Sequence, residues 1–263
     1  MKAKTNGIEL NYELRGKEGA PWLVFSHSLA CSLRMWDDQV TAFKDRYRVL
    51  AFDTRGHGAS SAPAGAYSLE QMADDVKGLF AHLGIEHAHF VGLSMGGMIG
   101  QTFALKYPGI CQSLTLADTT SRYPAEAAGV WADRIKLAET RGMQPLVEPT
   151  LERWFTEPFR KAKPEVVARI GAQISATPVP GYVGCSHAIP KINLTARLKE
   201  IRCPILVIVG EQDAGTPPAM AREIHDNAPG SKLVVLPGAA HLSNVEQPAS
   251  FDAALGALLA AVK

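Results

Sequence analysis

Short runs of apolar residues recur along the chain, and segments with helical periodicity separate them. Ile8–Leu14 alternates apolar and polar residues, and Trp22–Phe25 is a short continuous apolar run. Alternation is typical of a half-buried strand, whereas a short continuous run is typical of a strand buried on both faces. Further short runs lie at 47–52, 88–91, 113–117, 204–209 and 232–236. The pattern predicts a sheet with a buried centre.

The segments between these runs predict helices. In Leu69–Leu83, apolar residues repeat at intervals of three and four, and Ser68-Leu69-Glu70-Gln71 supplies a capping box at the start. Pro217–Asn227 and Phe251–Val262 are also amphipathic at helical spacing. Strands that alternate with helices imply an α/β fold with a mostly parallel, doubly wound sheet. Ligands of such sheets bind beyond the carboxyl ends of the strands.

The alternation is interrupted from about Ser121 to Asn193, a stretch with several prolines and no convincing strand. Helical segments are visible at 132–138 and 165–174. Because the strand pattern resumes after this stretch, we expect a helical cap inserted before the last two strands rather than a separate helical domain. The expected division is a core domain formed by 1–120 and 194–263, with a cap at 121–193.

Residues Gly92-Leu93-Ser94-Met95-Gly96 stand between a predicted strand and a segment compatible with a helix. A serine on a sharp strand-to-helix turn between glycines is a nucleophile elbow. Glycines suit this turn because it needs unusual backbone angles and because strand and helix approach closely there. The pattern alone is a weak signal, so the hypothesis depends on whether an acid and a base follow at later strand ends.

The candidate acid and base both lie in loops that follow predicted strands. A serine hydroxyl needs a base within hydrogen-bond reach, and the base needs a carboxylate that fixes its tautomer. Asp213 follows the run at 204–209, and His241 follows the run at 232–236. Ser, Asp, His is the chain order that accompanies this elbow. We therefore predict Ser94, Asp213 and His241 as the catalytic residues.

Other residues fit these roles less well. Asp118 also ends a strand and is the alternative acid; with Asp213 as the acid, we expect Asp118 to have a structural role, such as capping the start of the insertion. His57, in Asp53-Thr54-Arg55-Gly56-His57-Gly58, is expected to organise a tight loop. His225 lies inside a predicted helix. The base is therefore expected at His241.

Attack on an acyl carbon creates an oxyanion, which two preorganised donors must stabilise. The elbow supplies one of them, the backbone N–H of Met95 at the start of a helix, where the helix dipole also favours negative charge. The second donor is expected in the loop after Phe25, and we assign it to Leu29 N–H. The Ser28 hydroxyl is a further polar contact for the substrate. The alternative is that this loop is merely a turn.

Composition and charge restrict the partners. The formal net charge of +1 provides no general field for nucleic acid or an anionic membrane, so a small-molecule partner is expected. No apolar run approaches the roughly 20 residues of a membrane span, and no signal core follows Met1, so we expect a cytoplasmic protein. The scattered cysteines predict reduced thiols, and the histidines around His87 lack partners for a metal site.

Several motifs together resemble the α/β-hydrolase family across essentially the whole chain. They are the elbow, Asp-Thr-Arg-Gly-His-Gly (53–58), Gly-Glu-Gln-Asp (210–213) and Ala-His-Leu-Ser-Asn (240–244). More narrowly, the chain is similar to 3-oxoadipate enol-lactonases in segments 28–36, 92–101, 153–160 and 241–248. The cap segment 153–160 is the most informative, because caps vary with substrate whereas elbows do not. His27 is a departure, since asparagine is expected there in these enol-lactonases.

The resemblance implies that Ser94, Asp213 and His241 hydrolyse a small enol-lactone bearing a carboxymethyl group to 3-oxoadipate, in bacterial catabolism of aromatic compounds. No metal or organic cofactor is needed. A substrate carboxylate calls for an arginine in an apolar pocket, and Arg134, one helical turn from Trp131, is the candidate. Trp131 and Trp154 are expected to shape the apolar walls. The alternatives are a solvated arginine and tryptophans that only pack the cap.

Two other functions remain open at this level. A general carboxylesterase or perhydrolase would use the same three catalytic residues, with a cap that accepts uncharged esters. A non-catalytic small-molecule receptor on a hydrolase fold belongs to a different class, because a fold alone does not fix a function. The complete set of serine, acid and base argues against the receptor.

Overall fold

The computed structural model describes residues 1–262 and contains one eight-stranded sheet. Its strands are β1 (Lys2–Thr5), β2 (Ile8–Arg15), β3 (Trp22–Ser26), β4 (Arg48–Phe52), β5 (Ala88–Leu93), β6 (Cys111–Ala117), β7 (Ile205–Gly210) and β8 (Lys232–Leu236). They lie in the order β1-β2-β4-β3-β5-β6-β7-β8. The pairs β1–β2 and β2–β4 are antiparallel, and all other pairs are parallel. The prediction of a mostly parallel sheet is confirmed.

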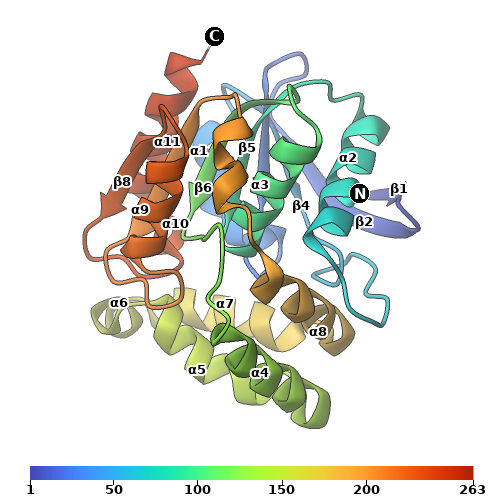
Figure 1. Cartoon of the computed structure of the whole chain (residues 1–263), viewed down its shortest axis with the longest axis vertical. Helices are drawn as coiled ribbons and strands as arrows, with labels where there is room; N and C mark the ends of the chain where they lie inside the picture. The colour runs from blue at the N-terminus through green and yellow to red at the C-terminus, as the bar shows by residue number, and fades with distance from the viewer. Residues whose placement is uncertain (263) are drawn as a thin grey trace.

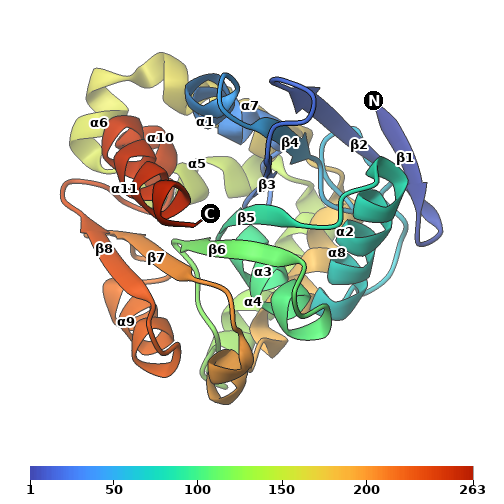
Figure 2. The same ribbon diagram turned by 90° about the horizontal axis from the view of Figure 1, so that it is seen from above.

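Helices of the core domain cover both faces of this sheet. They are α1 (Asp37–Phe43), α2 (Leu69–Leu83), α3 (Met95–Lys106), α9 (Pro218–Asn227), α10 (Ser243–Glu246) and α11 (Pro248–Ala261). Helices α2, α3 and α9 lie on one face, and α1 and α11 lie on the other (Figure 2). Every residue of β5 and of β7 is buried, which explains why these strands appear in the sequence as continuous apolar runs.

The chain between β6 and β7 forms a helical layer beyond the ends of the strands (Figure 1). This cap contains α4 (Ala127–Arg141), α5 (Gln144–Trp154), α6 (Glu157–Ala162), α7 (Pro164–Ala176) and α8 (Val179–Ala188). The sequence pattern predicted parts of α4 and α7 and missed α5, α6 and α8. Helix α8 is buried on most sides and has no clear amphipathic period. Helix α5 has one buried face, but its internal Pro149 argues against a helix when the sequence alone is considered.

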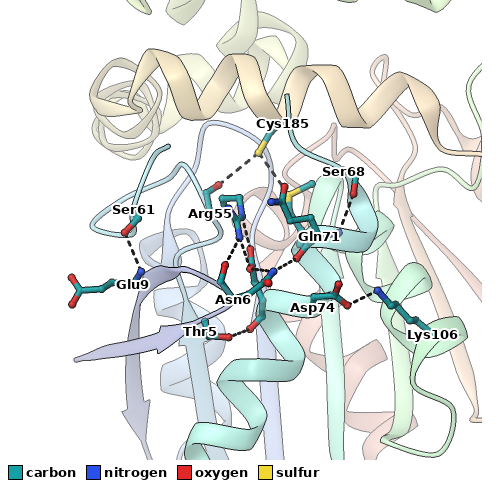
Figure 3. A network of polar contacts seen from close by, with 12 residues as sticks. Thr5, Asn6, Glu9, Arg55, Ser61, Ser68, Gln71, Asp74, Lys106 and Cys185 are labelled. Atoms are coloured by element: carbon teal, nitrogen blue, oxygen red, sulfur yellow. Dashed lines mark hydrogen bonds and ion pairs between the residues drawn. The ribbon is translucent and has the colours of Figure 1, made fainter. Parts of the chain in front are cut away.

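Helix α8 of the cap lies directly on the loop that follows β4. A Cβ atom at Gly181 would lie 1.9 Å from the carbonyl oxygen of Gly56, so the two backbones touch. Figure 3 shows Cys185 of α8 pointing toward Arg55, with its Sγ 3.7 Å from the Arg55 carbonyl oxygen. The Arg55 guanidinium is held by a buried ion pair with Asp75 at 2.7 Å. This side of the cap is therefore fixed to the core by close packing.

Candidate active site

The turn between β5 and α3 holds Ser94 in a strained conformation. Its backbone angles are φ 56° and ψ −117°, which few residues other than glycine adopt. A Cβ atom at Gly92 would lie 2.1 Å from the Gly96 carbonyl oxygen, and one at Gly96 would lie 2.1 Å from the Ser26 carbonyl oxygen. Both glycines are therefore required for the close approach of strand, helix and the loop after β3. The local geometry is that of a nucleophile elbow.

His241 and Asp213 form a buried pair beside this turn. The His241 Nδ1 atom lies 2.9 Å from Asp213 Oδ2, and the exposed fractions of their side chains are 5% and 0%. Asp213 Oδ1 accepts hydrogen bonds from the backbone N–H groups of Gly215 and Thr216, at 2.7 and 3.0 Å. The Thr216 hydroxyl donates to Oδ2 at 2.8 Å. These bonds fix the carboxylate so that it faces the imidazole.

The environment of Asp213 favours its charged form. Burial by itself would raise the pKa of Asp213, but the neighbouring imidazole and the hydrogen bonds from His241 and Thr216 outweigh this effect. The pKa of Asp213 consequently lies below its ordinary value. The carboxylate therefore stays ionised at neutral pH, as an acid that orients and stabilises an imidazolium must be.

Asp118 does not cap the start of the insertion, and that expectation is wrong. Its Oδ1 accepts a hydrogen bond from Gly210 N–H at 2.8 Å, and its Oδ2 accepts one from the Ser243 hydroxyl. The carboxyl group thus joins the ends of β6 and β7 to α10, because its side chain turns into the core. Burial and the negative charge of Asp213 hold the pKa of Asp118 well above its ordinary value.

Two neutral histidines shape the loop after β3. The Nε2 of His27 accepts a hydrogen bond from Thr54 N–H, and the Nε2 of His57 accepts one from Ala30 N–H, both at 2.9 Å. Burial lowers the pKa of both rings, and burial together with the neighbouring His27 lowers the pKa of His57 to about 3. Both rings therefore remain neutral acceptors at ordinary pH. His57 organises the loop, as expected from the sequence.

This loop and the start of α3 present the proposed oxyanion donors. The hydrogen bonds among residues 1–262 include none donated by the N–H of Leu29 or of Met95, so both groups are free to bind an oxyanion. The Ser28 hydroxyl is buried and also lacks a partner within the described chain. Ser28 and Leu29 line the same cavity as Ser94.

The cavity, of about 200 Å³, lies between the carboxyl ends of the strands and the cap. Ser94 and His241 line its core side, and Trp131, Arg134 and Trp154 line its cap side. The Arg134 guanidinium lies 4.9 Å from the centre of the Trp131 ring. The Trp154 ring stacks over the His241 ring with their centres 5.8 Å apart. All three cap residues singled out in the sequence therefore lie at the cavity.

The sequence reasoning missed a second arginine. Arg153 also lines the cavity, and its Nη2 donates to Thr150 Oγ1 at 3.2 Å. Within residues 1–262, no carboxylate lies within ion-pair distance of Arg134 or Arg153. Burial and the positive charge of Arg134 lower the pKa of Arg153. Arg153 directly precedes Trp154 and lies in the segment 153–160 that resembles enol-lactonases. This position in the sequence could have identified Arg153 as a candidate cavity residue.

Tyr123 and Tyr182 add hydroxyl groups to the cavity wall. Burial and the nearby charge of Asp213 raise the pKa of Tyr123 to about 12, so its hydroxyl stays protonated and is able to donate a hydrogen bond. Burial also raises the pKa of Tyr182. The cavity thus combines apolar walls, two cations and neutral donors, a lining that suits a small molecule with an anionic group.

Residues 1–262 contain neither a metal-binding cluster nor a membrane-spanning helix. No group of three or more histidine, cysteine, aspartate or glutamate side chains is arranged to hold a metal ion. No helix in this range has the length and apolar character needed to cross a membrane. The four cysteines are free thiols.

Strand order, elbow and inserted cap together define the class. Residues 21–248 match the family model described as alpha/beta hydrolase fold, so the chain belongs to this family and is a hydrolase. The chain is 37% identical over 252 residues to 3-oxoadipate enol-lactonase 2 of Acinetobacter baylyi, covering 96% of this chain and 93% of that protein.

Two solved structures have nearly the same fold as this chain. The crystal structure of the enol-lactonase from Burkholderia xenovorans LB400 matches with a TM-score of 0.95 and 38% identity, covering 99% of this chain and 100% of that one. A thermophilic esterase from Thermogutta terrifontis, solved with malate bound, matches with a TM-score of 0.94 and 32% identity. The match covers 100% of this chain and 99% of that one. The chain is therefore similar to hydrolases that act on lactones and on esters.

Proposed function

We propose that this hydrolase opens a small enol-lactone that carries a carboxylate, giving 3-oxoadipate, by way of an acyl-enzyme on Ser94. One observation carries the proposal: the cavity that holds Ser94 and His241 also presents two arginines, Arg134 and Arg153, that have no carboxylate partner in the described chain. Two cations beside an apolar wall are a costly arrangement unless an anion binds between them. The similarity to enol-lactonases supports this choice of anion.

The chemical steps follow from the roles of the residues. His241 takes the hydroxyl proton as Ser94 attacks the lactone carbonyl, and Asp213 stabilises the imidazolium that forms. Leu29 and Met95 N–H groups bind the oxyanion. The ring C–O bond breaks, and the leaving enolate is protonated to a ketone that stays attached to the acyl group. Water activated by His241 then hydrolyses the Ser94 ester and releases the dicarboxylate product.

The substrate carboxylate and the reacting carbonyl occupy opposite ends of the cavity in this proposal. Arg134 and Arg153 bind the carboxylate, while Trp131 and Trp154 enclose the ring. The related esterase from Thermogutta terrifontis was solved with malate bound, and malate is also a small dicarboxylate, which is consistent with an anionic ligand for this group of hydrolases. The reaction would belong to the bacterial catabolism of aromatic compounds.

A general carboxylesterase is the second candidate, because the cavity walls are mostly apolar and a relative of 32% identity is an esterase. The deciding experiment compares kcat/KM for the enol-lactone with kcat/KM for a neutral ester of equal size. We expect the enol-lactone to be the better substrate by at least roughly tenfold, the value of one charge-assisted hydrogen bond. A preference for the neutral ester would reject the enol-lactonase proposal in favour of the esterase.

A further inference from the structure

One buried carboxylate joins the cap to the loop that carries His241. Glu246, in α10, is 6% exposed. Its Oε1 accepts hydrogen bonds from the backbone N–H of Thr156 at 3.1 Å and from the Thr156 hydroxyl, and its Oε2 accepts one from Ala240 N–H at 2.9 Å. Thr156 belongs to the cap, and Ala240 directly precedes His241. The two oxygens of one side chain thus bind two parts of the molecule that are 84 residues apart in the sequence.

Two more contacts occur at the same place. The backbone N–H of Leu242 donates to the Trp154 carbonyl oxygen at 3.1 Å. The Trp154 ring stacks over the His241 ring, with an interplanar angle of 30°. The residue before His241, the residue after it and the imidazole itself therefore all meet the segment 154–156, directly or through Glu246.

The carboxylate of Glu246 is satisfied by hydrogen-bond donors alone. No cation lies within ion-pair distance of Glu246 in the part of the chain that the structure describes. A buried carboxylate is costly unless its lone pairs are used, and here both oxygens accept. A glutamine would have to turn its amide NH₂ toward Thr156 N–H or Ala240 N–H, and two donors repel each other. The site therefore selects a carboxylate and not merely a polar group of that size.

We propose that Glu246 is a positioning residue that couples the cap to His241, and this inference rests on the proposed function of His241 as the base. The backbone on both sides of His241 is held through Glu246–Ala240 and Leu242–Trp154. The same cap segment contributes Trp154 to the cavity wall. A substrate that packs against Trp154 therefore restrains the segment that orients the imidazole, so cap and base act as one unit during acylation and deacylation.

The test uses variants at both ends of the link. Glu246→Gln breaks the hydrogen bond to Thr156 N–H or the one to Ala240 N–H. Thr156→Val removes the hydroxyl that donates to Glu246. Thr156→Ser keeps that donor. Glu211→Gln is the matched control, because Glu211 Oε2 accepts Gly238 N–H from the same loop at 3.2 Å and has no hydrogen bond to the cap. Each full-length variant is checked by thermal unfolding and assayed with the enol-lactone and with p-nitrophenyl acetate.

We expect kcat to fall roughly fivefold for Glu246→Gln and for Thr156→Val on both substrates, with KM changed less than about twofold, since a net hydrogen bond is worth about 1 kcal/mol. Thr156→Ser and Glu211→Gln should stay within about twofold of the wild type. The double variant Glu246→Gln/Thr156→Val should be no slower than the slower single variant, because both changes cut one link.

The inference is overturned if Glu246→Gln and Thr156→Val keep the kcat of the Glu211→Gln control, or if only KM changes. It is also overturned if the kcat of the double variant falls by the product of the two single-variant factors. Should Glu246→Gln fail to fold, Thr156→Val is compared with Thr156→Ser in both kcat and thermal unfolding. The Thr156 hydroxyl also accepts from Phe159 N–H at the start of α6, and loss of that cap alone is expected to lower stability but not kcat. Ser94→Ala separates the two proposals: turnover by that variant rejects the proposed function, whereas an inactive Ser94→Ala beside an unaffected Glu246→Gln rejects only the coupling.

Discussion

The ring of Trp154 in the cap stacks on the ring of His241 in the core, with centres 5.8 Å apart. The Trp154 carbonyl oxygen also accepts a hydrogen bond from Leu242 N–H. Both the side chain and the backbone of Trp154 therefore contact the loop that carries His241. The proposed base is therefore not covered by a separate lid but is in direct contact with the element that also forms the substrate cavity. Changes in the cap are expected to affect turnover as well as binding.

Replacing Ser94 tests the nucleophile. Ser94→Ala removes the only group in the proposal that forms the acyl-enzyme, so kcat for the enol-lactone should fall by roughly a million-fold. A burst experiment with p-nitrophenyl acetate should lose its pre-steady-state phase. Wild-type rates in the alanine variant would mean that Ser94 is not the nucleophile, whatever the substrate.

The acid is tested by a matched pair of asparagine variants. Asp213→Asn should lower kcat about ten-thousand-fold, because an amide stabilises the wrong imidazole tautomer. Asp118→Asn should leave kcat within roughly threefold, since His241 Nδ1 contacts Asp213 and not Asp118, and the Ser243 hydroxyl is able to accept a hydrogen bond from the new amide. Steady-state kinetics of both variants decide the assignment. The reverse order of effects would make Asp118 the acid.

The two arginines are tested through substrate charge. Arg153→Ala and Arg134→Ala should each lower kcat/KM for the anionic enol-lactone by roughly 10- to 100-fold, the range for a hydrogen bond to a charged group. For an uncharged ester of equal size, each variant should stay within about threefold. Arg169→Ala, on the cap but not at the cavity, is the control. Equal losses on charged and neutral substrates would exclude a role in carboxylate recognition.

The buried imidazole of His57 predicts how stability depends on pH. Its pKa is 6.5 in the unfolded chain and about 3 in the folded protein, so between these values only the unfolded chain binds the proton. The neutral His57 ring therefore makes its full contribution to the free energy of unfolding above pH 6.5. Below pH 6.5 the free energy of unfolding falls by about 1.4 kcal/mol for each pH unit, down to about pH 3.

Urea unfolding at several pH values between 7 and 4 measures this effect. The difference in unfolding free energy between the wild type and His57→Gln should become smaller as the pH falls, because glutamine still offers an acceptor to Ala30 N–H but does not titrate. Parallel pH curves for the wild type and His57→Gln would contradict the lowered pKa of His57.

Much of the fold was predictable because it depends on local patterns. Continuous apolar runs such as 88–91 and 204–209 identified β5 and β7, since strands buried on both faces must be apolar throughout. The apolar spacing and capping box of Leu69–Leu83 gave α2 with its bounds. Helix α5 was missed because its internal Pro149 argues against a helix, and helix α8 was missed because burial on most sides removes the amphipathic period that marks a helix.

The sequence by itself determined the α/β class and the position of Ser94 on a sharp turn, because turn chemistry and strand periodicity are properties of neighbouring residues. It also placed Asp213 and His241 after later strands, since parallel strands end at one edge of a sheet. Only the tertiary structure decided that Asp118 faces Gly210 and Ser243 rather than the insertion. The same holds for Arg153 beside Arg134 and for Glu246 between cap and core. These relations join residues that are distant in the chain, and packing rather than local propensity determines them.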